Sequence, residues 1–263
     1  MSIHKKIALA TLITLGMAAC GGGGSGSPST AATSHADIQG VKTALAAKNT
    51  NKEEANKEEA KKTSQNLSDY TVTLAGVQHN VGKMAKNELV EGVNGKEAFR
   101  AYRQAYSVVA GSFALQPTTG GDPDDNSPDM KMPMQVKLIN GEATQTLPTA
   151  GKYTYNGAAF SNSETGRLTY NVDFDKKVGS GAVTGLAQIG DVKLDQAELK
   201  HTNFSNPSNG SLVLAHGVEG TVSKDKELVG DYHVHLFGPN AEEVAGMVLH
   251  HKAGEIGVIG KRD

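Results

Sequence analysis

Histidines stand at the spacing that most directly suggests chemistry in this sequence. His233 and His235 are two residues apart, and His250 and His251 are adjacent further along the chain. Side chains two apart in a strand point to the same face, so His233 and His235 would present two imidazoles together, and a neighbouring strand could add a third. The sequence cannot identify acidic ligands or hydrogen-bond partners for such a site. Solvent-facing histidines are the simpler interpretation, and we expect no metal site.

Haem demands less of the sequence, because one histidine beside an apolar slot can ligate its iron. His79, His201 and His216 are further candidates, and nothing in the sequence selects among the nine histidines. The cofactor-binding residues therefore stay unknown. We expect no resident cofactor and keep haem as an alternative.

A run of aspartates could supply the oxygen ligands that calcium prefers. Asp122, Asp124, Asp125 and Asp129 lie in a long segment rich in Pro, Asp and Gly, Gln116–Met134. The run lacks the glycine and the closing glutamate of an EF-hand loop, and two prolines interrupt it. We expect a solvated acidic loop.

Motifs for catalysis are not evident. Gly179-Ser180-Gly181 is not a GxSxG elbow, and no glycine run leads into a GK[ST] phosphate loop. No HExxH and no pair of carboxylates at strand ends is found either. We therefore expect no enzymatic activity and no catalytic residue.

The one cysteine, Cys20, closes an amino-terminal targeting segment. Lys5 and Lys6 precede an apolar run, Ile7–Leu15, which is too short to span a bilayer as a helix. The tetrapeptide MAAC that follows has the form of a bacterial lipobox, with methionine where leucine is usual. We predict a signal peptide over residues 1–19.

Lipidation of Cys20 would attach the mature chain to a membrane, because each buried CH₂ of an acyl chain contributes about 0.8 kcal/mol. Gly21 rather than aspartate follows the cysteine, which favours the outer membrane. A Gly/Ser-rich stretch, Gly21–Thr30, and a doubled NKEEA over Asn51–Ala60 come next. Neither carries an apolar stripe, so residues 20–68 are expected to form a tether.

Composition excludes several classes of protein. The chain has 263 residues with 26 Lys and Arg against 28 Asp and Glu, a formal net charge of -2. Without a basic excess it is a poor candidate for nucleic acid. A single cysteine excludes a disulfide framework and CxxC zinc sites within one chain. The 31 glycines indicate many turns.

The back half of the sequence has the pattern of β-strands. In Arg167–Phe174, the residues Leu168, Tyr170, Val172 and Phe174 alternate with polar ones. About eight such runs occur between turn signals: Lys152–Phe160, Arg167–Phe174, Gly181–Leu186, Asp191–Leu199, Gly210–Ala215, Leu228–Phe237, Val244–His251 and Glu255–Lys261. Eight closely spaced strands predict an antiparallel up-and-down β-barrel filled by side chains.

The run Leu228–Phe237 repeats the alternation. Tyr232, Val234 and Leu236 are expected to face inward. The alternate positions, which include His233 and His235, are then expected to face solvent.

The front half, about Asp69 to Leu147, is ambiguous. Phe99, Tyr102 and Tyr106 have helical spacing, whereas Tyr102, Tyr106 and Val108 also fit one face of a strand. Periodicity alone cannot decide between the two structures.

The back half contains four distinctive segments: YNGAAF at Tyr155–Phe160, LTYNVDF at Leu168–Phe174, GSGAVTG at Gly179–Gly185 and FGPNAEEVAG at Phe237–Gly246. In this order they resemble the barrel of the transferrin-binding-protein-B-like and factor-H-binding-protein-like surface lipoproteins of Gram-negative bacteria. In the front half, FRAYRQAYS at Phe99–Ser107 resembles the family element F-x-x-Y-(K/R)-Q-x-x-S.

The resemblance implies a mainly β protein with an N-terminal β-rich handle domain, expected over residues 69–147, and a C-terminal eight-stranded barrel over 148–263. It implies display on the outer membrane after export by a partner surface lipoprotein assembly modulator. A host protein bound in colonisation or immune evasion is the implied ligand. Ligand-contacting loops differ within the family, so no ligand residue is carried over.

Two other functions remain open from the sequence. One is a haem or iron-source acquisition lipoprotein that delivers its ligand to an outer-membrane receptor. The other is a structural envelope lipoprotein that faces the periplasm.

Overall fold

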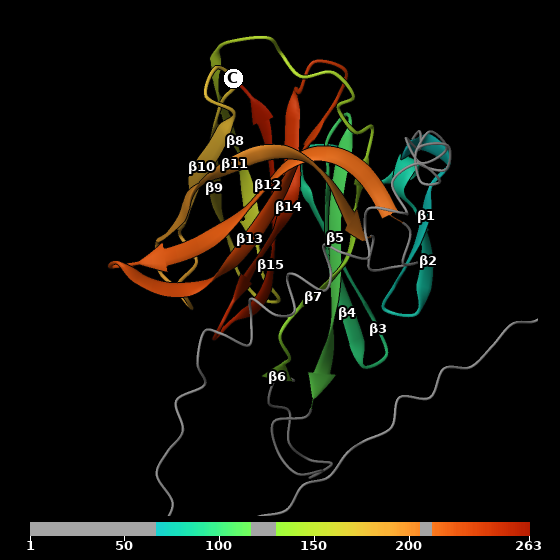
Figure 1. Ribbon diagram of the computed structural model, residues 1–263. Coiled ribbons are helices and arrows are strands. Elements are labelled where there is room, and N and C mark those ends of the chain that lie inside the picture. Colours follow the sequence, from blue (N-terminus) through green and yellow to red (C-terminus); the bar gives the residue numbers. More distant parts are fainter. Residues whose placement is uncertain (1–66, 117–129, 206–211) are drawn as a thin grey trace, which may run out of the picture. The chain divides into compact units, whose positions relative to one another are not determined.

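The structure, a computed structural model, describes residues 67–116, 130–205 and 212–263. Cys20, the NKEEA repeat and the whole acidic run, Asp122–Asp129, lie outside these residues. Among the described residues, no helix is long and apolar enough to cross a membrane. The regular structure of the described ranges consists of strands and two short 3-10 helices, η1 (Leu67–Asp69) and η2 (Val81–Lys83) (Figure 1).

Eight strands of the back half form a closed antiparallel barrel, which confirms the predicted fold class. They are β8 (Lys152–Phe160), β9 (Thr165–Asp173), β10 (Val178–Thr184), β11 (Val192–Ser205), β12 (Leu212–Lys224), β13 (Glu227–Phe237), β14 (Glu243–His250) and β15 (Gly254–Arg262). Consecutive strands pair with one another, and β15 returns to pair with β8, so that Arg262 lies opposite Tyr155. This last pairing closes the barrel.

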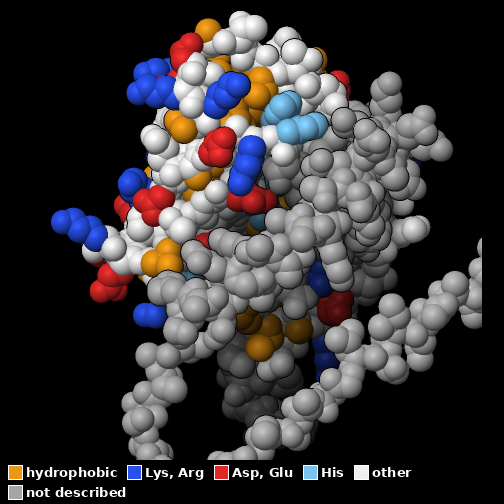
Figure 2. Space-filling model, viewed as in Figure 1, with side chains coloured by type: hydrophobic (Ala, Val, Ile, Leu, Met, Phe, Trp, Pro, Cys, Tyr) orange, Lys and Arg blue, Asp and Glu red, His pale blue; other side chains and the backbone are white. Residues whose placement is uncertain are grey.

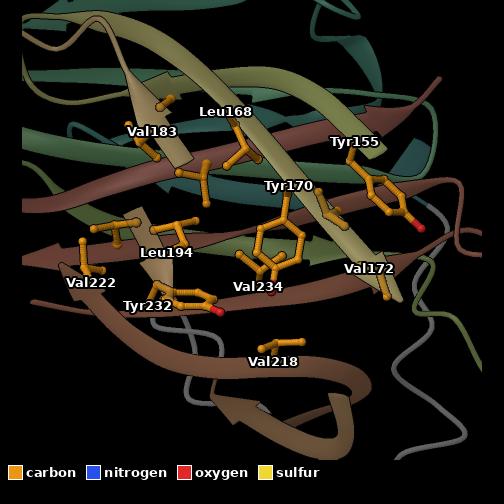
Figure 3. Close-up of a cluster of buried hydrophobic side chains, with 14 of the residues drawn as sticks. Tyr155, Leu168, Tyr170, Val172, Val183, Leu194, Val218, Val222, Tyr232 and Val234 are labelled. Atoms are coloured by element: carbon orange, nitrogen blue, oxygen red, sulfur yellow. The ribbon is translucent and has the colours of Figure 1, made fainter. Parts of the chain in front are cut away.

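The barrel interior is filled by side chains from all of its strands (Figure 3). Leu168, Tyr170, Val172 and Phe174 are all buried there, as their alternation predicts. Two of the interior tyrosines donate their hydroxyl groups to backbone carbonyls: Tyr155 Oη to Ala241 and Tyr232 Oη to Asp195, each at 2.7 Å. A barrel of eight strands is just wide enough for side chains to fill it.

The front half forms a second sheet rather than helices. Its strands are β3 (Leu89–Asn94), β4 (Glu97–Arg103), β5 (Ser107–Gln116), β6 (Met130–Lys131) and β7 (Gln135–Gly141), in the order β3-β4-β5-β6 with β7 also paired to β5. We call this the front sheet. Phe99 and Tyr102 lie in β4, Val108 lies in β5, and Tyr106 lies in the turn between them. The ambiguous spacing therefore arises from two strands and a turn.

The front sheet is covered on both faces (Figure 1). A hairpin of β1 (Thr71–Leu74) and β2 (Val77–Asn80) packs on one face through Val72 and Leu74. The barrel packs on the other face, where Phe160, Phe237 and Ile259 meet Val109 and Phe113 of the sheet. The front sheet ends at Gly141 and the barrel begins at Lys152. The domain limits at 147 and 148 stay a prediction.

Candidate binding surfaces

His235 is completely buried, contrary to the expectation that His233 and His235 face solvent. Both side chains point out of the barrel, but the front sheet covers the wall at His235. Its neighbours in register, Ala245 on β14 and Gly217 on β12, lie on the same covered face. A Cβ added to Gly217 would lie 2.4 Å from Nδ1 of His235, so the missing side chain makes room for the imidazole. The alternation of polar and apolar residues predicts which side chains face the barrel interior. It cannot predict that another sheet covers part of the outer wall.

Burial sets the protonation of this histidine. The pKa of the His235 imidazole lies well below the ordinary value of 6.5, chiefly because of desolvation and further because of the nearby His233. The rings of His233 and His235 lie 5.5 Å apart. The pKa of His233 is also lowered by desolvation, although Glu219 opposes the shift. His235 is thus a neutral side chain held between the two layers.

Acidification is expected to destabilise the protein through His235. The unfolded chain binds a proton at this histidine below about pH 6.5, whereas the folded chain does not. The free energy of unfolding therefore decreases as the pH is lowered below about 6.5. Thermal melts from neutral pH down to about pH 5 should show a falling melting temperature, with a shallower fall in His235→Leu. Glu243, whose pKa is raised by burial, contributes the opposite slope.

The control for this experiment is His251→Leu, because His251 is exposed. Its melting temperature should follow that of the wild type at every pH. Equal pH dependence in His235→Leu and wild type would show that His235 does not carry the effect.

The other predicted histidine pair does not join the first. His250 lies opposite Gly230 and His233 lies opposite Met247, so the two pairs are separated along their strands. The His250 Nδ1 atom instead accepts hydrogen bonds from the backbone of Lys252 and Ala253, at 3.2 and 3.3 Å, and shapes the β14–β15 turn. Within the described residues, no three His, Cys, Asp or Glu side chains are placed to hold a metal.

One histidine pair does meet at the surface. His201 on β11 and His216 on β12 are cross-strand partners, and their rings stack at 4.6 Å with an interplanar angle of 30°. His201 is exposed and His216 is half-buried. Burial and the adjacent His201 lower the pKa of His216. By contrast, His79 packs against the ring of Phe99, with ring centroids 4.5 Å apart.

A buried carboxylate joins the barrel to the front sheet. Glu243, at the start of β14, accepts hydrogen bonds from the backbone N–H of Ala105 at 2.9 Å and of Tyr106 at 3.0 Å, and from Ser107 Oγ at 2.7 Å. Desolvation raises the pKa of Glu243, while these three donors act in the opposite direction. The carboxylate thereby holds the β4–β5 turn, which belongs to the FRAYRQAYS element.

A buried guanidinium makes a second connection between the layers. Arg100 on β4 donates through Nη1 to the carbonyls of Ser161 and Glu164, at 2.9 and 2.6 Å. It also pairs with Glu91, through Nε at 2.8 Å and through Nη2. Arg100 and Glu243 therefore fix the front sheet to the barrel through polar contacts. Sequence reasoning did not find either residue, because both act on partners far away in the sequence.

A cleft of about 720 Å³ opens where the front sheet meets the β1–β2 turn and the β14–β15 turn. Its volume falls in the range of roughly 300–1,000 Å³ that is usual for ligand sites. Its apolar part includes Phe113, Met132, Met134 and the exposed Leu249, and carboxylates, including that of Glu97, line it as well. This is the first candidate surface for a ligand.

A second cleft, of about 470 Å³, lies beside Arg100. Val93, which is 68% exposed, lines it together with Leu115 and Phe113, and Lys131 adds a positive charge. On the face of the molecule seen in Figure 2, charges of both signs are interspersed, and histidines are exposed among them.

The barrel matches a known protein family. Residues 145–248 match the family model described as factor H binding protein, C-terminal. The matched range includes β8 to β13 and most of β14.

Solved structures with low sequence identity are also similar to this chain. A transferrin binding protein B from Haemophilus parasuis is 15% identical, with 75% of this chain and 42% of that chain covered and a TM-score of 0.46. HpuA from Kingella denitrificans, solved in complex with human haemoglobin, is 13% identical over 68% of this chain and 72% of its own, with a TM-score of 0.40. The matched region is less than half of the transferrin binding protein B chain.

Proposed function

The barrel of this chain belongs to the family of factor H binding protein-like surface lipoproteins, and on this premise we propose that the protein binds a host macromolecule at the cell surface. The family match over residues 145–248 is the observation that carries the proposal. The role is one of binding rather than catalysis.

Because side chains fill the barrel, its interior has no room for a macromolecular ligand. Tyr155, Tyr170 and Leu194 are fully buried among the side chains of the interior. A macromolecule must therefore contact the outside of the body, where apolar clefts with a few polar groups are the usual sites. We propose the 720 Å³ cleft as the main contact.

Capture from host fluid tests this function. The mature chain, immobilised and exposed to host serum or tissue fluid, is expected to retain a protein that mass spectrometry identifies. Leu249→Asp, at the larger cleft, should reduce capture. Val93→Asp tests the smaller cleft, and Leu228→Asp is the matched control because Leu228 is 60% exposed and lines neither of them. Capture of no host protein would contradict the proposal.

Haem acquisition is the second candidate, and the stacked pair of His201 and His216 favours it. The exposed imidazole of His201, beside the half-buried His216, could supply an axial ligand to haem iron. A Soret band that shifts on titration with haem, and that is lost in the double variant His201→Ala, His216→Ala, would support this function. Delivery to an outer-membrane receptor would then follow. No spectral change would contradict it.

The proposed location is the outer face of the outer membrane. Residues 1–19 would serve as the signal peptide, the lipid on Cys20 as the anchor and residues 20–68 as the tether. A surface lipoprotein assembly modulator would carry the chain across the outer membrane. Removal of residues 1–19 with Lys5 and Lys6 would take the formal net charge from -2 to -4, so the mature chain would have little attraction to anionic lipid headgroups and the anchor would hold it alone.

Cys20→Ala is expected to abolish acylation. The thiol is the acceptor of the lipid, so radiolabelled palmitate should enter the wild type but not the variant, and the variant should leave the outer-membrane fraction. Ser25→Ala, in the same segment, is the control and should behave as the wild type. Palmitate in the Cys20→Ala protein would show that the lipid is attached elsewhere.

A further inference from the structure

The turn between β1 and β2 holds a residue in an unfavourable backbone conformation. Leu74 pairs with Val77, so Ala75 and Gly76 alone form the turn, with φ of 47° and 72°. Such turns favour Asn-Gly, and a non-glycine residue in the left-handed region costs about 1–2 kcal/mol. The Ala75 side chain is 3% exposed and packs in the core beneath the hairpin. Burial of the Ala75 methyl group therefore offsets part of the backbone strain at this turn.

One side-chain amide holds this strained turn. Asn94 Nδ2 donates to the Ala75 carbonyl at 2.9 Å. Asn94 is the last residue of β3 and pairs with Glu97 across the next two-residue turn, in which Gly95 has φ of 58°. The amide therefore joins the β1–β2 turn to the β3–β4 turn. Both Asn94 and Gly95 are exposed.

We propose that Asn94 is a site of spontaneous deamidation, and that this reaction releases the β1–β2 hairpin from the front sheet. The backbone nitrogen of Gly95 attacks Cγ of Asn94. The new C–N bond closes a five-membered succinimide, the proton of the Gly95 N–H passes to Nδ2, and the Cγ–Nδ2 bond breaks to release ammonia. Water then opens the ring at either carbonyl and yields aspartate or isoaspartate. Water is the only co-reactant, and no electron is transferred.

The structure selects Asn94 among the Asn-Gly pairs. Glycine leaves the attacking nitrogen unshielded, and a Cβ added at Gly95 would have no neighbour within 4 Å. Asn140, which precedes Gly141, is 3% exposed, so water and hydroxide reach it only when the structure opens. A further Asn-Gly pair, Asn209–Gly210, lies outside the described residues.

The remaining Asn-Gly pair lies in the middle of a paired strand of the barrel. Asn156 and Gly157 lie within β8, where Gly157 is paired on both sides with Leu168 and Gly260. The Asn156 amide donates to Asp263 and its carbonyl accepts from Thr169 Oγ1. Ring closure there would break the strand pairing of the barrel.

Deamidation at Asn94 would change the contact that holds the hairpin. An aspartate or isoaspartate carboxylate cannot donate to the Ala75 carbonyl, so two acceptors would face each other. The isoaspartate form also lengthens the backbone and disturbs the pairing of Asn94 with Glu97. Ala75, Gly76 and Glu97 line the 720 Å³ cleft, so the reaction also adds a negative charge beside that cleft.

The test is a timed incubation of the mature chain at physiological pH and temperature, followed by peptide mapping. Conversion of the Asn94 amide to acid is expected to be at least about tenfold faster than at Asn140 or Asn156. Those two sites react only after local unfolding, and an unfolding step that costs only ~1.4 kcal/mol already slows a reaction tenfold. Asn94→Gln, whose longer side chain disfavours ring closure, should resist. The urea-unfolded chain gives the unprotected rate. An Asn94 that is converted unfolded but stays intact folded would overturn the proposal.

Release of the hairpin is measured separately. Hydrogen exchange over Thr71–Asn80 should accelerate in Asn94→Asp and in the aged protein, while exchange in β9 and β13 stays unchanged. Asn94→Gln keeps an amide at this position and is the matched control for the loss of the donor. Unchanged exchange over the hairpin in Asn94→Asp would refute the release.

Discussion

Phe174→Ala is expected to lower the free energy of unfolding by about 3–5 kcal/mol. Phe174 is 4% exposed and belongs to the core of the barrel, where its ring meets that of Tyr153 edge-on at 5.7 Å between centroids. A domain is stabilised by only about 5–15 kcal/mol in total, so this loss is a large part of it. Thermal melts followed by circular dichroism would measure the effect.

The matched control for this prediction is Leu228→Ala. Leu228 is 60% exposed on β13, and a substitution at such a site usually changes stability by less than about 0.5 kcal/mol. Phe174→Leu should lie between the two. A Phe174→Ala protein that melts with the wild type would mean that Phe174 does not lie in the core.

Glu243→Ala is expected to separate the front sheet from the barrel locally. The change leaves the N–H of Ala105 and Tyr106 and the hydroxyl of Ser107 without their acceptor. A buried donor left unpaired costs about 1–3 kcal/mol, and this cost applies to the Ser107 hydroxyl, which is buried, whereas the two N–H groups are only partly buried. We therefore expect a marked fall in melting temperature, together with faster hydrogen exchange in the β4–β5 turn.

Two variants sharpen the test of Glu243. Glu243→Gln keeps the shape and one acceptor but turns an NH₂ group toward a donor, so its loss should be smaller than that of alanine. Glu198→Ala, at an exposed position of β11, should have little effect. Slow exchange at Ala105 and Tyr106 in Glu243→Ala would show that the carboxylate does not hold the turn.

The barrel could be predicted from the sequence because every barrel strand has one face in an interior packed with apolar side chains. Leu168, Tyr170 and Val172 alternate with polar residues for that reason, and all three are buried. The same logic failed at His235, since its outward face lies beneath the front sheet. No local pattern reports that a distant segment will cover a surface.

The candidate surfaces were less predictable than the fold. Glu243 and its partners Ala105 and Ser107 are far apart in the sequence, and only the register of the sheets brings them together. The stacking of His201 on His216 also depends on the pairing of β11 with β12. Resemblance of the FRAYRQAYS element marked the right segment but not its role as a contact between layers. Lipidation of Cys20 stays a prediction.

The pairing that closes the barrel has a kinetic consequence. β8 and β15 are neighbours in space but are separated in sequence by the other six strands of the barrel. Contacts between such distant segments form late, and β proteins dominated by them fold in milliseconds to seconds rather than microseconds. Until β15 has been synthesised, β8 lacks its partner on one side. We therefore expect pairing of β8 with β15 to be the last step of barrel folding, and the barrel to become rigid only when that step is complete.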